Sequence, residues 1–264
     1  MEFVESHGHL DDDAFAKDLP QVIEAARAAG VRRFINIGYE PESWARSLAL
    51  AEQHPDVSYA LGMHPNSADR WSNDVATELE HLLDATNPVA IGETGLDYYR
   101  EWVDHSSQKA AFRDQLELAR SFSLPVIVHM RGDVEPELTE ILQAFPTVRV
   151  VFHSFDGSAH LRDFALRRGD MFGIGGLMTR SGSADLRETL REIPLDSMLL
   201  ETDAPYLTPR GVKERRNTPA NIPIIAQALA DLLAVPIERI AERTTANAEE
   251  IFQLVASAPV GAAQ

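Results

Sequence analysis

Eight short runs of β-forming apolar residues alternate with longer amphipathic segments along the 264-residue chain. Most of these runs lack polar alternation, which is typical of parallel strands buried on both faces. The alternation therefore predicts an α/β fold, either a parallel barrel or a doubly wound sheet. The predicted strands are Phe3–Ser6, Arg33–Ile37, Ser58–Gly62, Val89–Glu93, Val126–His129, Arg149–His153, Met171–Ile174 and Met198–Glu201.

The segments between the predicted strands carry apolar residues at helical spacing. No Gly-x-Gly-x-x-Gly sequence follows a strand, which weakens the dinucleotide-binding alternative and favours a (β/α)8 barrel. We expect residues 1–255 to form this single domain and the small-residue tail at 256–264 to fray. The predicted helices are Asp18–Ala29, Pro41–Glu52, Asp74–Asp84, Ser106–Ser121, Glu135–Ala144, His160–Arg168, Ala184–Arg191, Ala220–Leu233 and Glu238–Leu254.

Composition limits the chemistry that the chain can support. The absence of cysteine excludes disulfides, thiolate nucleophiles and cysteine-ligated metals, so any metal must be bound by nitrogen and oxygen. A net charge of −17 argues against general coating of nucleic acid, although it allows local phosphate contact through metal ions and a few basic side chains. No apolar run approaches the ~18 residues of a membrane span, and no signal-like segment opens the chain. We therefore expect a cytoplasmic protein without membrane contact.

Potential metal ligands follow or end five of the predicted strands. In a parallel barrel these strand ends meet on one face, where barrel enzymes carry their active sites. Side chains at i and i+2 of an extended chain point the same way, so two of these imidazoles can face one ion. The six candidates are His7, His9, Glu93, His129, His153 and Asp203.

Four imidazoles and two carboxylates suit Zn, Mn, Fe, Co or Ni, while Mg prefers more oxygen. Six ligands exceed the need of one tetrahedral ion, so the set allows either one ion or two ions bridged by Glu93. Asp203 is then both a ligand and the acceptor for the proton of the attacking water. A single histidine at a strand end is more often a packing residue, and His54, His81 and His105, like His160, are interpreted that way.

The chain resembles the TatD-related metal-dependent hydrolases, or TatD-type deoxyribonucleases, over essentially its whole length. Two long segments are the most specific: Gly-Glu-Thr-Gly-Leu-Asp-Tyr at 92–98 and Glu-Thr-Asp-Ala-Pro-Tyr-Leu at 201–207. Further matches are Glu5-Ser6-His7-Gly8-His9-Leu10, Gly62-Met63-His64-Pro65, Pro125-Val126-Ile127-Val128-His129, Phe152-His153-Ser154-Phe155-Asp156-Gly157 and Arg216-Asn217-Thr218-Pro219.

The resemblance implies a TIM-like barrel of the amidohydrolase type that binds one or two divalent metal ions, such as Mg, Mn or Zn. It implies hydrolysis of DNA phosphodiesters, single-stranded or at 3′ ends, with Asp203 and Glu93 as catalytic residues and the six ligands already named. Glu5 and Gly8 depart from the usual Asp and Cys or Thr, and Met130 replaces a frequent Ser. None of these departures removes a ligand.

Several residues are candidates for substrate binding rather than metal binding. The segment 210–216 is the most basic stretch of an acidic chain and follows the last predicted strand. Its alternative interpretation is a solvated loop. Aromatic faces can stack on unpaired bases, and arginine can bind a phosphate through two hydrogen bonds. The candidates are His64, Arg131, Tyr98, Arg215 and Arg216.

Three functions remain open at the level of sequence. The first is a metal-dependent deoxyribonuclease resembling a 3′ exonuclease, which the basic loop and the resemblance favour. The second is a small-molecule amidase, lactonase or deacylase, which the acidic surface and the nitrogen-rich ligand set favour. The third is a metal-stabilised scaffold without catalytic activity. This function would not explain why so many polar residues lie at the strand ends. No protein partner is evident from the sequence.

Overall fold

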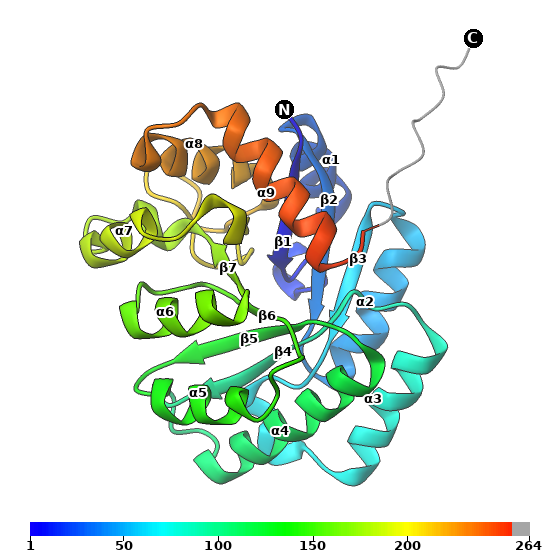
Figure 1. Ribbon diagram of the computed structural model, residues 1–264. Helices are drawn as coiled ribbons and strands as arrows, with labels where there is room; N and C mark the ends of the chain where they lie inside the picture. Colours follow the sequence, from blue (N-terminus) through cyan, green and yellow to red (C-terminus); the bar gives the residue numbers. More distant parts are fainter. Residues whose placement is uncertain (255–264) are drawn as a thin grey trace.

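The computed structural model describes residues 1–254, and these form an eight-stranded parallel barrel surrounded by helices (Figure 1). The predicted α/β barrel is confirmed, with strand order β1 to β8 following the chain. The strands are β1 (Phe3–Gly8), β2 (Val31–Gly38), β3 (Val57–Leu61), β4 (Ala90–Asp97), β5 (Val126–Arg131), β6 (Val150–Phe152), β7 (Met171–Ile174) and β8 (Met198–Leu200). The predicted tail at 256–264 lies outside the described residues, and the domain limit at residue 255 stays a prediction.

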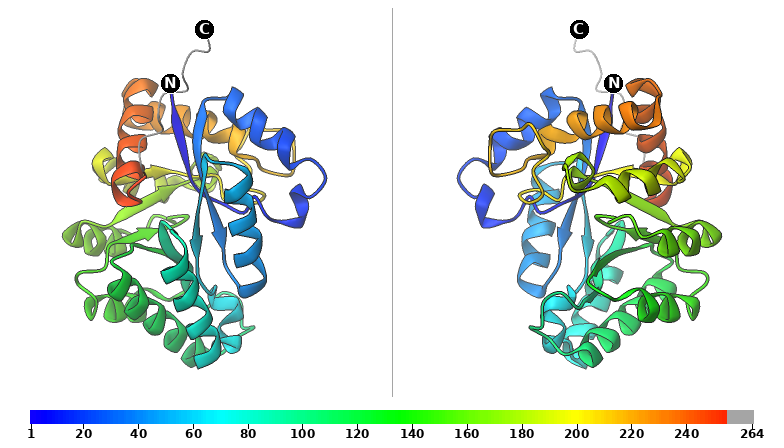
Figure 2. Two further views of the ribbon diagram at one scale, coloured as in Figure 1. Left: turned by 90° about the vertical axis from the view of Figure 1, so that its right-hand side faces the viewer. Right: turned by 90° about the vertical axis from the view of Figure 1, so that its left-hand side faces the viewer.

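Helices α1 to α7 follow the first seven strands, and α8 and α9 follow the eighth (Figures 1 and 2). They are α1 (Leu19–Ala28), α2 (Pro41–Gln53), α3 (Asn73–Ala85), α4 (His105–Phe122), α5 (Glu135–Gln143), α6 (Ala159–Arg168), α7 (Ala184–Arg191), α8 (Ile222–Leu233) and α9 (Ile237–Ile251). Within residues 1–254 no single helix could span a membrane by length and apolarity. Only the pair Pro219–Leu233 and Ile237–Ile251, bent by 112°, passes that test together.

Two large apolar clusters account for most of the packing, beside two small ones. One fills the space between the strands and the surrounding helices and includes Phe3, Phe34 and Leu116. The other fills the inside of the barrel with residues from every strand, such as Ile127, and is continued by Phe252 and its neighbours at the end of α9. Apolar side chains therefore occupy the interior toward one end and leave the carboxyl ends of the strands for polar groups.

Strand β4 runs four residues beyond its predicted end at Glu93. Gly92 and Gly95 have φ angles of 139° and 142°, which other residues rarely adopt. A Cβ atom at Gly95 would lie 2.1 Å from the carbonyl oxygen of His129 on β5. Glycine thus allows β4 to continue in close contact with β5, whereas glycine in a sequence ordinarily signals the end of a strand.

The first and last strands meet through contacts that also place the predicted ligands. The backbone N–H of Asp203 donates to the carbonyl of His7 at 3.0 Å, and that of His9 donates to Ala204 at 2.8 Å. The buried Glu5 carboxylate accepts a hydrogen bond from the backbone N–H of Thr202 at 2.8 Å. Asp203 has a positive φ of 55°, a conformation that Asp tolerates better than most residues.

Candidate metal centre

The two-residue period of a strand explains why histidines point into the barrel. Ile127 and Val151 belong to the interior cluster on β5 and β6. His129 and His153 follow them by two residues, so their side chains leave the backbone on the same interior side, nearer the carboxyl end. On each of these two strands, the last apolar residue that faces the interior is therefore followed, at the next interior position, by a potential metal ligand.

The carboxylate of Glu93 lies between two groups of imidazoles, and its Oε2 atom faces the β1 histidines. This oxygen lies 3.5 Å from Nε2 of His7 and 3.9 Å from Nε2 of His9. The Oδ1 atom of Asp203 lies 3.4 Å from Nε2 of His9 and 3.8 Å from Nε2 of His7. These four side chains form one side of the centre.

The Oε1 atom of Glu93 faces the other group. It lies 2.6 Å from Nδ1 of His129, and 3.8 Å from Nε2 of both His64 and His153. His64, expected only to contact substrate, is therefore as close to Glu93 as the predicted ligand His153. All six predicted ligands lie together at the carboxyl end of the barrel, and His64 joins them.

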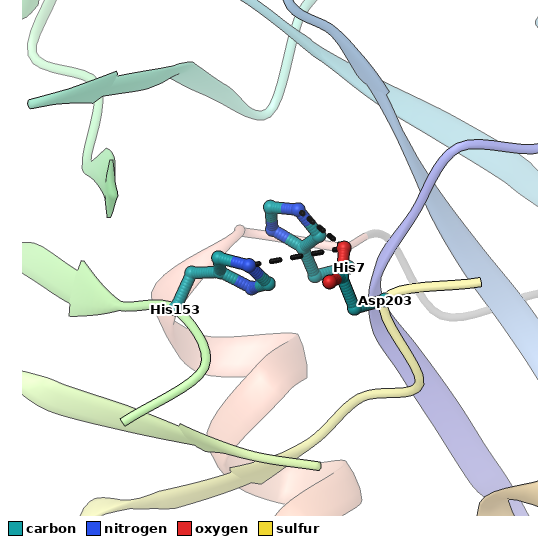
Figure 3. Close-up of side chains that lie close together, drawn as sticks. All are labelled: His7, His153 and Asp203. Atoms are coloured by element: carbon teal, nitrogen blue, oxygen red, sulfur yellow. Dashed lines mark ion pairs between the residues drawn. The ribbon is translucent and has the colours of Figure 1, made fainter. Parts of the chain in front are cut away.

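Figure 3 shows how β1, β6 and the segment after β8 bring three of these side chains together. The rings of His7 and His153 stack with centroids 3.5 Å apart, and each Nε2 atom lies 3.8 Å from Oδ1 of Asp203. The two stacked imidazoles therefore direct their Nε2 atoms toward the same carboxylate oxygen.

The donor set fits a divalent cation. Both ring nitrogens of His7 are buried and form no hydrogen bond within residues 1–254, although buried polar atoms are nearly always paired. Three groups bring their ligand atoms within 4.8 Å of one another and could hold an ion: His7, His153 and Asp203; His7, His9 and Glu93; His64, Glu93 and His129. Glu93 belongs to two of these groups, one on each side of its carboxylate.

Electrostatics in the centre favour added positive charge. Burial alone would raise the pKa of Glu93, but the surrounding imidazoles, His153 foremost, hold it well below its ordinary value. Burial would likewise lower the pKa of His153, yet the carboxylates of Glu201, Glu93 and Asp203 raise it to about 10. Burial lowers the pKa of His64 to about 3. Glu93 is thus ionised, and binding of a cation would displace the proton that His153 now holds beside it.

Comparison with known proteins places the chain in a family. The family model described as TatD related DNase matches residues 4–253. The chain belongs to the TatD-related DNase family. It is therefore a metal-dependent hydrolase.

Curated relatives and solved structures of the TatD-related family agree with this assignment. The metal-dependent hydrolase YabD of Bacillus subtilis is 32% identical, with coverage of 95% of this chain and 98% of its own. The 3′-5′ ssDNA/RNA exonuclease TatD of Erwinia tasmaniensis is 37% identical, covering 93% and 98%. The crystal structure of YjjV, a TatD homologue from Escherichia coli, superposes with a TM-score of 0.90 at 31% identity, covering 96% and 98%.

Two further carboxylates, neither of them predicted as a site residue, contact histidines of this centre. Asp97 lies 3.3 Å through its Oδ2 atom from Nε2 of His129. Glu201 lies 3.0 Å through its Oε1 atom from Nδ1 of His153. Such contacts fix the orientation of a histidine that ligates metal. The sequence did contain a signal for Glu201, because this residue follows the interior residue Leu199 by two positions and comes directly after β8.

Among the other predicted substrate-binding residues, the structure separates those with polar side-chain partners within the protein from those without an ion pair in the described chain. The Tyr98 hydroxyl donates to Glu137, and its ring stacks on His105 at 3.4 Å. Arg216 forms two hydrogen bonds with Asp18, at 2.8 and 2.6 Å. Tyr98 and Arg216 are therefore engaged within the protein.

Arg131 and Arg215 are exposed, and neither forms an ion pair within the described chain. Arg131 ends β5, two residues after His129, while Arg215 lies in the segment that follows β8. Both remain predictions for substrate contact.

Proposed function

We propose that the protein is a divalent-metal-dependent exonuclease that hydrolyses single-stranded nucleic acid, DNA in particular, from the 3′ end. The observation that carries the proposal is the location of the metal centre amid unpaired cations on the carboxyl face of the barrel. The name of the Erwinia tasmaniensis relative, a 3′-5′ ssDNA/RNA exonuclease, supports the same substrate class.

The distribution of ion pairs distinguishes this face from the outer helices. On the helices most cationic side chains pair with carboxylates, as Arg27 does with Asp56 at 2.7 Å. Exceptions such as Arg113 and Arg167 exist. In the loops that follow strands, by contrast, Arg70 and Arg216 are the described cations that pair with carboxylates. At the end of β5 and in these loops, the following described side chains form no ion pair: Lys17, Arg100, Arg131, Arg180, Arg210, Lys213 and Arg215.

Cationic side chains that form no ion pair can bind an anionic ligand, even in a chain of net charge −17. A polyanionic strand supplies it locally, while the acidic remainder of the surface repels the strand elsewhere. A neutral amide or lactone substrate would gain nothing from cations spread over five loops. This distribution therefore favours the nuclease over the small-molecule alternative.

The chain's own residues fit two ions, one on each side of Glu93. His7 and His9 would complete the Oε2 side, and His64 and His129 the Oε1 side. Ions so held supply Lewis acidity to the phosphate and lower the pKa of water near it. Nε2 of His153 lies 3.8 Å from Oε1 of Glu93 and 3.8 Å from Oδ1 of Asp203, which itself lies beside His7 and His9 on the Oε2 side.

Asp203 is suited to take the proton of the attacking water. Burial alone would raise its pKa, but the imidazoles of His153 and His9 hold it below the ordinary value, so the carboxylate is ionised and ready to accept. Its side chain is 14% exposed, against 4% for Glu93, so it can pass a proton on to solvent. Glu93, which is more deeply buried and belongs to two candidate ligand groups, would serve as a ligand rather than as the base.

The test uses purified protein stripped with a chelator and reloaded with Mg, Mn or Zn in turn. Single-stranded oligonucleotides labelled at the 5′ end should shorten stepwise, whereas the same oligonucleotide blocked at its 3′ hydroxyl should resist. A panel of lactones, esters and amides tests the small-molecule alternative in parallel. Stepwise loss from the 5′ end would refute the polarity. Turnover of the panel with none of the oligonucleotides would refute the nuclease.

A further inference from the structure

The loop between β4 and α4 exposes two large aromatic side chains. Tyr99 and Trp102 are each 66% exposed, the highest values among the large hydrophobic residues of the described chain. The guanidinium carbon of Arg131 lies 4.1 Å from the centroid of the Tyr99 ring, and that of Arg100 lies 4.3 Å from the Trp102 ring. These four residues, of which Arg131 comes from the end of β5 and the others from the loop, form two arginine–aromatic pairs that we call the aromatic platform.

Stability of the fold does not account for the platform. An exposed cation–π pair contributes only ~0.5–1 kcal/mol, and the exposed rings bury little apolar area. Neither arginine pairs with a carboxylate in the described chain, although Asp and Glu number 41. The neighbouring Tyr98 shows the contrasting case, since its ring packs against the core cluster and its hydroxyl donates to Glu137.

The platform is fixed beside the metal centre. Asp97 accepts hydrogen bonds through Oδ1 from the backbone N–H groups of Tyr99 and Arg100, at 3.0 and 3.1 Å. The other oxygen of Asp97 contacts His129 at 3.3 Å. One carboxylate therefore joins the start of the platform to a candidate ligand.

The loop also packs against Gly132, just after β5, and is buried at Val103, near its carboxyl end. Gly132 lies so close that a Cβ atom there would be 2.8 Å from the nitrogen of Tyr99. Val103, just after Trp102, is buried in a small cluster with Ala68 and Ala111. The two rings are thus exposed on a loop whose backbone is anchored on both sides.

We propose that the aromatic platform is a binding subsite for bases of single-stranded nucleic acid upstream of the bond that is cleaved. Aromatic rings and guanidinium planes stack on bases without sequence preference, while the arginine charge attracts the adjoining phosphates. This inference rests on the proposed function and adds a length requirement: a strand that reaches Tyr99 and Trp102 binds more tightly than a dinucleotide.

Binding is measured first without catalysis, so that its outcome is independent of hydrolysis. The titrant is a short deoxythymidine oligonucleotide added to chelator-treated protein, and the Kd is followed by fluorescence anisotropy. Trp102→Ala should weaken binding by roughly 10- to 100-fold, whereas Trp102→Phe should restore most of it because a stacking face is retained. Arg100→Ala should also weaken binding. Its matched control is Arg113→Ala, which removes an unpaired charge from the outer face of α4.

Catalysis then tests the length requirement. The ratio of kcat/KM for the oligonucleotide to kcat/KM for a dinucleotide should fall in Trp102→Ala through a rise in KM for the longer substrate. Equal Kd values for Trp102→Ala and the wild-type protein would overturn the platform even if the nuclease activity is present. Binding that depends on Trp102 without any oligonucleotide hydrolysis would retain the platform and overturn the proposed function.

Discussion

Nδ1 of His153 lies 3.0 Å from Oε1 of Glu201, so one buried carboxylate sets the direction in which this imidazole faces the centre. The arrangement depends on a glycine in the neighbouring strand β7. A Cβ atom at Gly173 would lie 2.0 Å from Oε2 of Glu201. The space for the carboxylate therefore exists because residue 173 has no side chain.

Gly173→Ala should consequently weaken metal binding. The added methyl group must displace the Glu201 carboxylate, and His153 then loses the partner that orients it. Loss of such a partner typically costs 10- to 100-fold in metal affinity, which isothermal titration with Mn or Zn would measure. Glu201→Gln should produce a similar loss without the steric conflict. The control is Gly182→Ala, because no heavy atom lies within 4 Å of a Cβ built there. Unchanged affinity in both Gly173→Ala and Glu201→Gln would contradict the role of Glu201.

The barrel was predictable because its determinants are local. Apolar runs and helical periodicity can each be recognised within a few residues. Eight alternations of strand and helix are compatible with only a few topologies. The candidate ligands could be selected because the carboxyl ends of parallel strands meet at one end of a barrel. The continuation of β4 was not predictable in the same way, since Gly92 and Gly95 allow close strand contact only once β5 is in place.

The roles of side chains outside the ligand set required tertiary contacts. Arg215 and Arg216 are adjacent in sequence, yet only Arg216 meets Asp18, a residue from the other end of the chain. Tyr98 and Tyr99 differ for the same reason, because Glu137 of α5 accepts a hydrogen bond from the hydroxyl of Tyr98, whereas the Tyr99 ring is exposed. A sequence pattern that marks a basic or aromatic segment cannot show which of its members the fold already uses.

The adjacent arginines provide a matched test of substrate contact. Arg215→Ala should lower the magnitude of the slope of log K against log salt for single-stranded DNA by ~0.7, because one phosphate contact is lost. Arg216→Ala removes the same charge but should change the slope less and instead increase proteolysis of the 208–218 loop, since it loses the contacts to Asp18 and the Ala14 carbonyl. A larger decrease of the slope in Arg216→Ala than in Arg215→Ala would show that Arg216 leaves Asp18 to bind substrate.

Asp170 should make stability depend on pH at the amino end of β7. Burial raises its pKa from 3.8 to about 6, although Arg168, which donates to it at 2.7 Å, acts in the opposite direction. A carboxyl whose pKa is higher in the folded state binds its proton more tightly there. Its contribution to the free energy of unfolding is therefore fully present below the unfolded pKa and is lost as pH rises through about 6.

The expected loss from this one group is ~1.4 kcal/mol between about pH 5 and about pH 7.5. Urea unfolding of wild-type protein and Asp170→Asn, both in chelator, would measure it, because Asn keeps an oxygen for the Val150 N–H and does not titrate. Other titrating groups are common to both proteins and cancel in the difference. A difference that stays constant with pH would show that Asp170 is ionised throughout this range.

Asp203→Asn should separate proton transfer from metal binding. Asn tolerates the positive φ of 55° at this position and keeps an oxygen for weak coordination, so the fold and some metal should be retained. It cannot accept a proton from the attacking water, and turnover should fall by ~10²–10⁴-fold.

Glu93→Gln provides the contrast, because the two carboxylates have different surroundings. The two oxygens of Glu93 face imidazoles on both sides, His129 at 2.6 Å and His7 at 3.5 Å, so loss of its charge should mainly lower metal occupancy. Both variants are compared at saturating metal, with bound metal measured directly and turnover expressed per occupied site. Asp203→Asn should remain slow per occupied site, whereas Glu93→Gln should recover part of its activity as occupancy rises. Near-normal turnover per site in Asp203→Asn would leave Asp203 as a ligand only and assign the proton to another acceptor.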